Sequence, residues 1–201
     1  MTFRNWLYLF FTSLLIGALA SLAVGVYFYF TDPEYILDLS VLIVTAGAGM
    51  MFSVLSQMGF FAYMMLNYIA RSMIRRRLIW STLQWILIVV VFFDLIYLRV
   101  VFLEHERALL VYSILPVVLM IISIVVAMWK VKLTQPSAFT PTVFFMFVAT
   151  ALEAIPALHE NNAEATLFMV VPLIFCNAWQ ILNLHRLVNN EVPAPEEKPA
   201  S

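Results

Sequence analysis

Six long apolar stretches with short polar connections run through the chain, and this pattern leaves few folds open to it. Five of them approach or exceed the roughly 18 apolar residues typical of a helix that crosses a bilayer, and the sixth does so if one acidic residue within it is accepted. Hydrophobic residues make up 64% of the chain and charged residues 11%, against about 25% charged in ordinary soluble domains. We therefore predict an all-α integral membrane bundle of six transmembrane helices, at residues 6–30, 36–69, 78–100, 108–129, 139–158 and 164–185.

The basic residues predict how this bundle is oriented. If the N-terminus is cytoplasmic, the outer side receives only Arg99 and Arg107 of the 11 basic residues. The cytoplasmic side then receives the other nine: Arg4, Arg71, Arg75, Arg76, Arg77, Lys130, Lys132, Arg186 and Lys198. Short loops that carry Lys and Arg stay on the cytoplasmic side of a membrane. The sequence thus predicts a multi-pass protein of the cell membrane with both termini in the cytoplasm.

The domain organisation follows from the same pattern. Residues 1–187 form one six-span domain, and residues 188–201, rich in Pro and Glu, form a disordered cytoplasmic tail. The first stretch is too long for a signal-peptide core and is expected to remain as an anchor. Asp32, Pro33 and Glu34 are a favourable start for the second helix, as Asn162 and Glu164 are for the last.

Small residues recur at every fourth position of the first two predicted helices. Residues four apart share one helix face, and small residues there allow two helices to approach closely within lipid. We therefore predict a packing ridge on each helix, formed by Ser13, Gly17, Ser21 and Gly25 and by Thr45, Gly49 and Ser53.

Amide side chains interrupt the apolar helices. Gln57 continues the second ridge within the segment SQMGFFAY, so it should point into the bundle. Asn177 and Gln180 lie on the last helix and Gln84 on the third, and Gln57 and Asn177 should lie at similar depths. One interpretation is a layer of interhelical hydrogen bonds. The alternative is that these amides form a face that binds a partner.

Charged side chains within the spans are harder to explain. Asp94 and Glu153 both fall in the outer third of their helices, and Arg99 follows Asp94 by five residues. A charge in the membrane interior is costly and usually has a partner. Three interpretations stay open: a structural ion pair, a position at the membrane rim, and a pathway for a proton or ligand.

Signals for catalysis are weak. The three histidines lie at loops or helix ends, the single cysteine, Cys176, is typical of a small buried side chain, and no motif for catalysis or phosphate binding is present. We therefore expect no enzyme activity, metal, cofactor or nucleic-acid partner. The basic run Arg71, Arg75, Arg76 and Arg77 should meet lipid headgroups at the cytoplasmic face. Docking of a cytoplasmic domain is the alternative.

Several segments together resemble one protein family. RNWLYLFFTSLLIG, SQMGFFAY, FFDLIYLR, ALEAIPAL and LIFCNAWQ occur in this order. They resemble the KbaA-like family of KinB-signalling pathway activation proteins from endospore-forming bacteria, over nearly the whole chain from Arg4 to about Leu184. The resemblance implies an integral membrane protein that promotes activity of the sensor histidine kinase KinB, which feeds the phosphorelay at the start of sporulation. It implies no catalytic residues.

Three classes of function remain in view. The resemblance favours a non-enzymatic protein that activates a KinB-type kinase through helix contacts in the bilayer. A small transporter or channel that uses Asp94 and Glu153 is the alternative, and an intramembrane enzyme is the third class. A bundle without a soluble domain is compatible with the first two.

Overall fold

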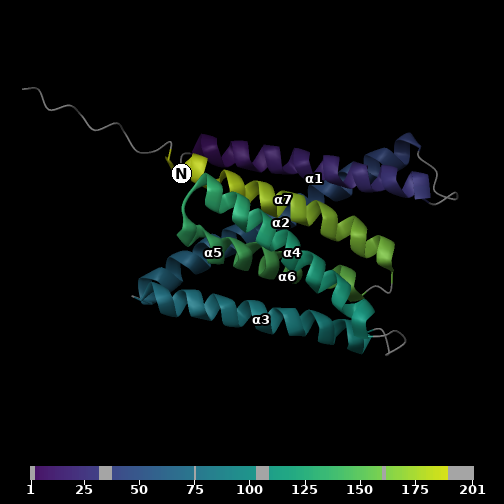
Figure 1. Cartoon of the computed structure of the whole chain (residues 1–201). Coiled ribbons are helices and arrows are strands. Elements are labelled where there is room, and N and C mark those ends of the chain that lie inside the picture. Colours follow the sequence, from purple (N-terminus) through teal and green to yellow (C-terminus); the bar gives the residue numbers. More distant parts are fainter. Residues whose placement is uncertain (1–2, 32–37, 75, 103–108, 160–161, 190–201) are drawn as a thin grey trace, which may run out of the picture.

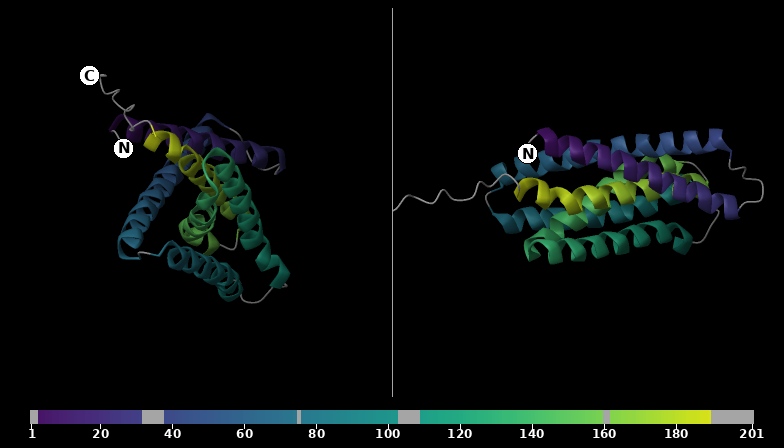
Figure 2. Two further views of the ribbon diagram at one scale, coloured as in Figure 1. Left: turned by 60° about the vertical axis from the view of Figure 1, so that its left-hand side comes forward. Right: turned by 90° about the horizontal axis from the view of Figure 1, so that it is seen from above.

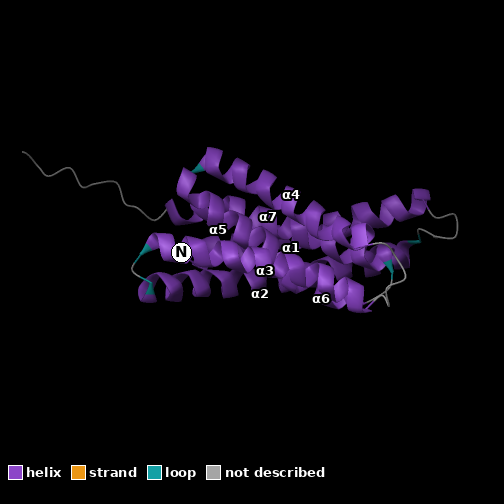
Figure 3. Ribbon diagram, turned by 60° about the horizontal axis from the view of Figure 1, so that its bottom comes forward, coloured by secondary structure: helices purple, strands orange, loops and turns teal. Residues whose placement is uncertain are grey.

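The computed structural model describes residues 3–31, 38–74, 76–102, 109–159 and 162–189. Every regular element within these ranges is helical (Figure 3). In chain order they are α1 (Phe3–Thr31), α2 (Leu39–Met73), α3 (Arg77–Phe102), α4 (Leu109–Leu133), the 3-10 turn η1 (Pro136–Ala138), α5 (Phe139–Phe144), the π-helical turn η2 (Phe145–Ala149), α6 (Thr150–His159) and α7 (Ala163–Asn189). Six helical segments are long and apolar enough to cross a membrane, because η1, α5, η2 and most of α6 form one continuous span. The predicted all-α bundle with six long apolar helices is confirmed.

Several described helices extend beyond the predicted boundaries, α2 to Met73, α4 to Leu133 and α7 to Asn189. Helix α2 begins at Leu39, after Asp38, whose carboxylate accepts a hydrogen bond from the Leu39 backbone N–H at 2.7 Å. The predicted start near residue 36 and the Asp32 to Glu34 cap lie outside the described residues. Helix α7 continues to Asn189, beyond the predicted end of the last span, and the rest of the predicted tail is outside the described residues. At its start, Asn162 accepts a hydrogen bond from the Glu164 backbone N–H at 2.8 Å.

The six spans run up and down the long axis of the bundle (Figures 1 and 2). The N-terminus, the junction of α2 with α3 and the end of α7 therefore lie at one end of the molecule. The span from Pro136 to Ala157 is the most enclosed. In its most apolar stretch 61% of the residues are buried, against 22% in α2 and 22% in α3. This span contacts α2, α3, α4 and α7, so it is the centre around which the other helices pack.

Aromatic side chains fill much of the core around this central span. In the π turn, four consecutive side chains are buried, which is possible because neighbours cover the helix on all sides. Phe145 contacts Phe60 of α2 edge to face at a centroid distance of 5.5 Å and Tyr63 of α2 at 4.9 Å. Phe147 stacks on Phe92 of α3 at 6.2 Å. The π turn thus ties α2 and α3 to the centre of the bundle through ring contacts.

Candidate functional site: a polar network inside the bundle

Helices α1 and α2 cross in close contact at Gly17 and Gly49. A Cβ atom added at Gly17 would overlap the backbone oxygen of Gly49, and one added at Gly49 would overlap the backbone oxygen of Gly17. The crossing has room for hydrogen atoms only. All seven residues of the two predicted ridges are buried. The four-residue spacing of small side chains therefore coincides with the surface on which the two helices meet.

Hydrogen bonds join the same two helices to α7 beside this crossing. Ser53 of α2 donates to the Ser13 hydroxyl of α1 at 3.0 Å. Gln180 of α7 donates through Nε2 both to Ser13 and to Ser56 of α2, each at 3.0 Å. Gln180 thus connects three helices at one point. Its side-chain oxygen, Oε1, has no hydrogen-bond partner among the described residues.

The network continues from α2 to the central span through Asn177. Ser56 donates to Asn177 Oδ1 at 2.8 Å. The amide nitrogen of Asn177 donates to the Thr150 hydroxyl at 2.9 Å and to Glu153 Oε2 at 2.8 Å. Asn177, Ser56 and Thr150 are fully buried. Hydrogen bonds therefore link α1, α2, α6 and α7 within the apolar interior, where each is protected from competition by water.

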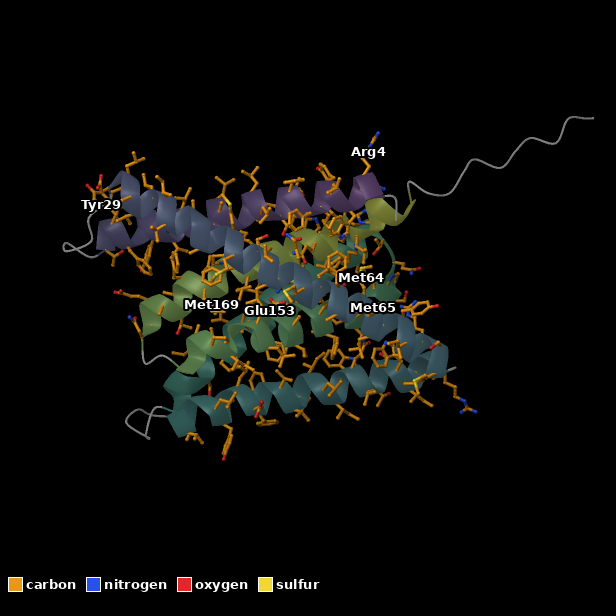
Figure 4. All side chains as sticks on the ribbon, turned by 180° about the vertical axis from the view of Figure 1, so that it is seen from behind. Arg4, Tyr29, Met64, Met65, Glu153 and Met169 are labelled. Atoms are coloured by element: carbon orange, nitrogen blue, oxygen red, sulfur yellow. The ribbon has the colours of Figure 1, made fainter. Side chains whose placement is uncertain are left out.

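Glu153 occupies a space that a glycine leaves open. It lies near the middle of the bundle, far from the ends marked by Arg4 and Tyr29 (Figure 4). A Cβ atom at Gly59 of α2 would overlap Glu153 Oε1, so the glycine of SQMGFFAY makes room for the carboxyl group. Oε1 has no hydrogen-bond partner among the described residues, whereas Oε2 accepts from Asn177. Glu153 is held on one side by an amide and on the other by the bare surface of α2.

The structure places the four predicted amides inside the bundle and gives Gln57 and Asn177 different partners. Gln57 donates to the Phe10 carbonyl of α1 and to Ser53, both at 3.3 Å, and does not meet Asn177. Ser56, the residue before it, contacts Asn177 instead. Gln84 is buried, and its Nε2 has no partner among the described residues. The amides thus form one network on α2 and α7, with Gln84 separate from it on α3.

The intramembrane charges do not come together at one site. Asp94 is exposed on α3, whereas Glu153 is buried against α2 and α7. The side chain of Arg99 lies outside the described residues. The predicted pathway that would use both acids therefore draws no support from their positions. Within the described residues, no group of three His, Cys, Asp or Glu side chains gathers as a metal site.

Lys130 is a further buried cation that the sequence analysis counted only for orientation. Its Nζ donates to the backbone oxygens of Ile181 and Leu182 on α7 at 2.7 and 3.2 Å. Ile181 and Leu182 lie about two turns before the end of α7. Lys130 thus joins the last turn of α4 to the backbone of α7.

Comparison with known proteins identifies the family. A family described as KinB-signalling pathway activation in sporulation matches residues 10–187. The chain belongs to this family. The KinB-signaling pathway activation protein of Bacillus subtilis (strain 168) is 38% identical over 192 residues, which cover 92% of this chain and 97% of that protein. No solved structure matches the chain significantly.

Within this KinB-signalling family member, sequence reasoning missed Ser56, Gly59, Thr150 and Lys130 as parts of the polar interior. Ser56 and Gly59 lie in SQMGFFAY, one turn apart on the helix, and this spacing was a signal that both share a buried face. Thr150 precedes Glu153 by three residues, which also places the two on one face. No local signal distinguished Lys130 from a lysine at the membrane surface.

Proposed function

We propose that this chain promotes activity of a KinB-type sensor histidine kinase at the start of sporulation, by helix contacts in the bilayer and without catalysis. Membership of the KinB-signalling family over most of the chain is the observation that carries the proposal. The polar network supports a structural role for its side chains, because each amide and hydroxyl in it binds a group of the same bundle. A kinase helix would then meet the outer surface of the bundle.

The exposed face of α3 is the surface we propose for this contact. Its exposed apolar residues include Ile86, Val90, Phe93 and Tyr97, and Asp94 is exposed beside them. A carboxylate on a lipid-facing surface is costly unless it reaches the headgroups or meets a polar group of another helix. A kinase helix with a basic or hydrogen-bond-donating side chain at this depth would satisfy Asp94. Only 22% of the residues in the most apolar stretch of α3 are buried, so most of this helix is open to lipid or to a partner helix.

Kinase autophosphorylation in membranes tests the function and the surface together. Deleting the protein should lower autophosphorylation of the KinB-type kinase and leave other kinases unchanged. Val90→Trp on α3 should lower it as well at matched abundance, because a large side chain blocks a close helix contact. Leu19→Trp on α1 is the matched control, since Leu19 is 56% exposed and Val90 54%.

Two outcomes would count against the proposal in different ways. Equal kinase activity with and without the protein would exclude kinase activation. If the Val90→Trp variant activated the kinase normally and the Leu19→Trp variant did not, the proposed function would stand but the contact would lie on α1 instead of α3.

The proposed orientation places both termini in the cytoplasm. Its support is the gathering of basic residues at the end of the bundle that holds the N-terminus, the junction of α2 with α3 and the end of α4 (Figure 1). A reporter fused after residue 132 or residue 191 should respond as cytoplasmic, and one inserted after residue 106 or 160 as external. A C-terminal reporter that responds as external would contradict this orientation.

A further inference from the structure

A cavity of about 520 Å³ opens at the corner between the end of α2, the start of α3 and the start of α5. These segments lie at the same end of the bundle as the N-terminus (Figure 1). The cavity reaches the surface, because five residues of its wall are exposed: Arg71, Leu78, Gln135, Pro136 and Ser137. Its volume falls in the range of pockets that hold small ligands or headgroups.

Gln84 is the feature that distinguishes this cavity from a packing defect. Its side chain lines the cavity, is only 1% exposed, and has an amide nitrogen without a partner among the described residues. Gln84 lies seven residues into α3, about 10 Å from its start, and is the residue of the described wall that lies farthest along this helix. A buried donor without an acceptor is unfavourable by the full cost of its desolvation. An acceptor in the cavity would remove this cost.

The other polar groups of the wall indicate what that acceptor is. Arg71 supplies a guanidinium group, and hydroxyl groups come from Ser81, Ser137 and Thr140. Among the described residues of the wall there is no carboxylate side chain. A wall that combines a guanidinium group with hydroxyl and amide donors is suited to phosphate, which Arg binds with two parallel hydrogen bonds.

Apart from the amide of Gln135, the rest of the described wall is apolar. Ile74, Leu78, Trp80 and Pro141 line the cavity beside the donors. Leu78 is 82% exposed, and the neighbouring Ile79 is exposed as well. Farther into the span, Leu83 and Ile86 of α3 are exposed as well, so a ligand with its polar group in the cavity could place its apolar part beside them, as a phospholipid would.

Hydrogen bonds between elements fix the shape of the corner. Tyr63 of α2 donates to the Pro141 carbonyl at 3.0 Å and so positions the start of α5. Trp80 of α3 donates to Asn67 of α2 at 3.0 Å and holds the two helices at the junction. A cavity whose walls are tied in this way loses little freedom when a ligand enters, which favours specific binding over diffuse attraction to a charged surface.

We propose that this corner binds the phosphate headgroup of an anionic glycerophospholipid, with Arg71 and Gln84 as its donors and the acyl chains along exposed apolar side chains farther into α3, Leu83 and Ile86. The site is independent of the kinase contact. It assigns to Arg71 a defined ligand, whereas Arg76, which is exposed but absent from the cavity wall, meets headgroups only by general attraction.

Thermal unfolding of the purified full chain in detergent, with added lipid, tests the site. Phosphatidylglycerol should raise the unfolding temperature and phosphatidylcholine should not. Arg71→Gln and Gln84→Leu should each weaken phosphatidylglycerol binding about tenfold, since each removes a hydrogen bond to a charged group. Arg76→Gln, which removes the same charge outside the cavity, should bind as the wild type does. Without lipid, Gln84→Leu should be as stable as the wild type or more stable, because it removes an unpartnered donor.

Other results would overturn the proposal. Equal stabilisation by phosphatidylcholine, or equal loss of binding in Arg76→Gln and Arg71→Gln, would mean that no specific headgroup site exists. If glycerol 3-phosphate alone stabilised the protein as much as the lipid, the cavity would belong to a soluble phosphate ester. A lower unfolding temperature of Gln84→Leu without lipid would assign Gln84 a structural partner and remove it from the site.

Discussion

The two halves of α2 meet their neighbours by different chemistry. From Thr45 to Gln57, α2 presents small and polar side chains, and α1 and α7 approach it closely enough for backbone contact and direct hydrogen bonds. From Phe60 to Arg71, it presents aromatic rings to the central span and ends at the open corner with α3. One helix therefore has a closely packed half and a half that leaves space.

The difference shows how a membrane bundle can combine a rigid part with an open part. Lipid tails are as apolar as the helices, so helices associate through close packing and hydrogen bonds rather than through hydrophobicity. The first half of α2 supplies both, and it should decide whether the protein folds. The second half supplies fewer of these contacts and retains a cavity with an unpartnered donor, so it is suited to binding.

The largest loss of stability is expected where α1 and α2 cross at Gly17 and Gly49. Gly17→Leu and Gly49→Leu should each destabilise the bundle by about 3 kcal/mol or more, because a side chain would meet the opposite backbone, which cannot rotate away. The yield of folded, monodisperse protein after extraction measures this effect. Gly47→Leu is the control, since nothing lies within 4 Å of a Cβ atom there. Normal yields of both crossing variants would mean that the packed half of α2 does not control folding.

A smaller loss of stability is expected when a residue of the hydrogen-bond network is replaced by an apolar one. Asn177→Leu should cost about 2 to 3 kcal/mol, because it leaves Glu153 and Ser56 without the partners that Asn177 provides. Thermal unfolding in detergent measures the loss. Asn183→Leu is a matched control on the same helix, because within the described part of the chain Asn183 donates only to the Trp179 carbonyl one turn earlier. Equal stability of the two variants would show that the network contributes little.

The effect of Gly59→Ala on stability should change sign when Glu153 is removed, because the two residues are in contact. Gly59→Ala should destabilise the protein by about 1 kcal/mol, since the added methyl group displaces the Glu153 carboxyl group but that side chain can move. In a Glu153→Ala background the same change should stabilise the protein, because Ala favours a helix over Gly by about 1 kcal/mol. Unfolding temperatures of the four proteins give the coupling. The same effect of Gly59→Ala in both backgrounds would contradict the contact.

The smallest loss of stability is expected beside the second half of α2, from Phe60 to Arg71, which ends at the cavity. Trp80→Phe should cost about 1 kcal/mol or less, because it removes the hydrogen bond to Asn67 and some apolar contact but leaves a ring in place. Trp85→Phe, at an exposed site on the same helix, is the control and should change nothing. A loss as large as that of Asn177→Leu would erase the distinction between the two halves of α2.

The sequence indicated which helix faces carry the polar network but not which side chains hydrogen-bond to each other. The four-residue spacing on α1 and α2 indicated the faces that meet, because this spacing is a local property of a helix. The partner of Asn177 could not be predicted in the same way. Ser56 and Gln57 differ by about 100° around the helix, so the rotation of α2 about its own axis decides which of them faces Asn177.

By itself, the sequence determined the helical class of this protein, the number and length of its apolar helices and the small-residue faces of the first two, because these depend on local composition and periodicity. Only the tertiary structure decided that Glu153 lies against Gly59, that Lys130 reaches the backbone of α7 and that Gln84 lines a cavity. The physical reason is that these contacts depend on how helices cross and on the π turn before Thr150. The wider π turn changes which residues of the central span face α7.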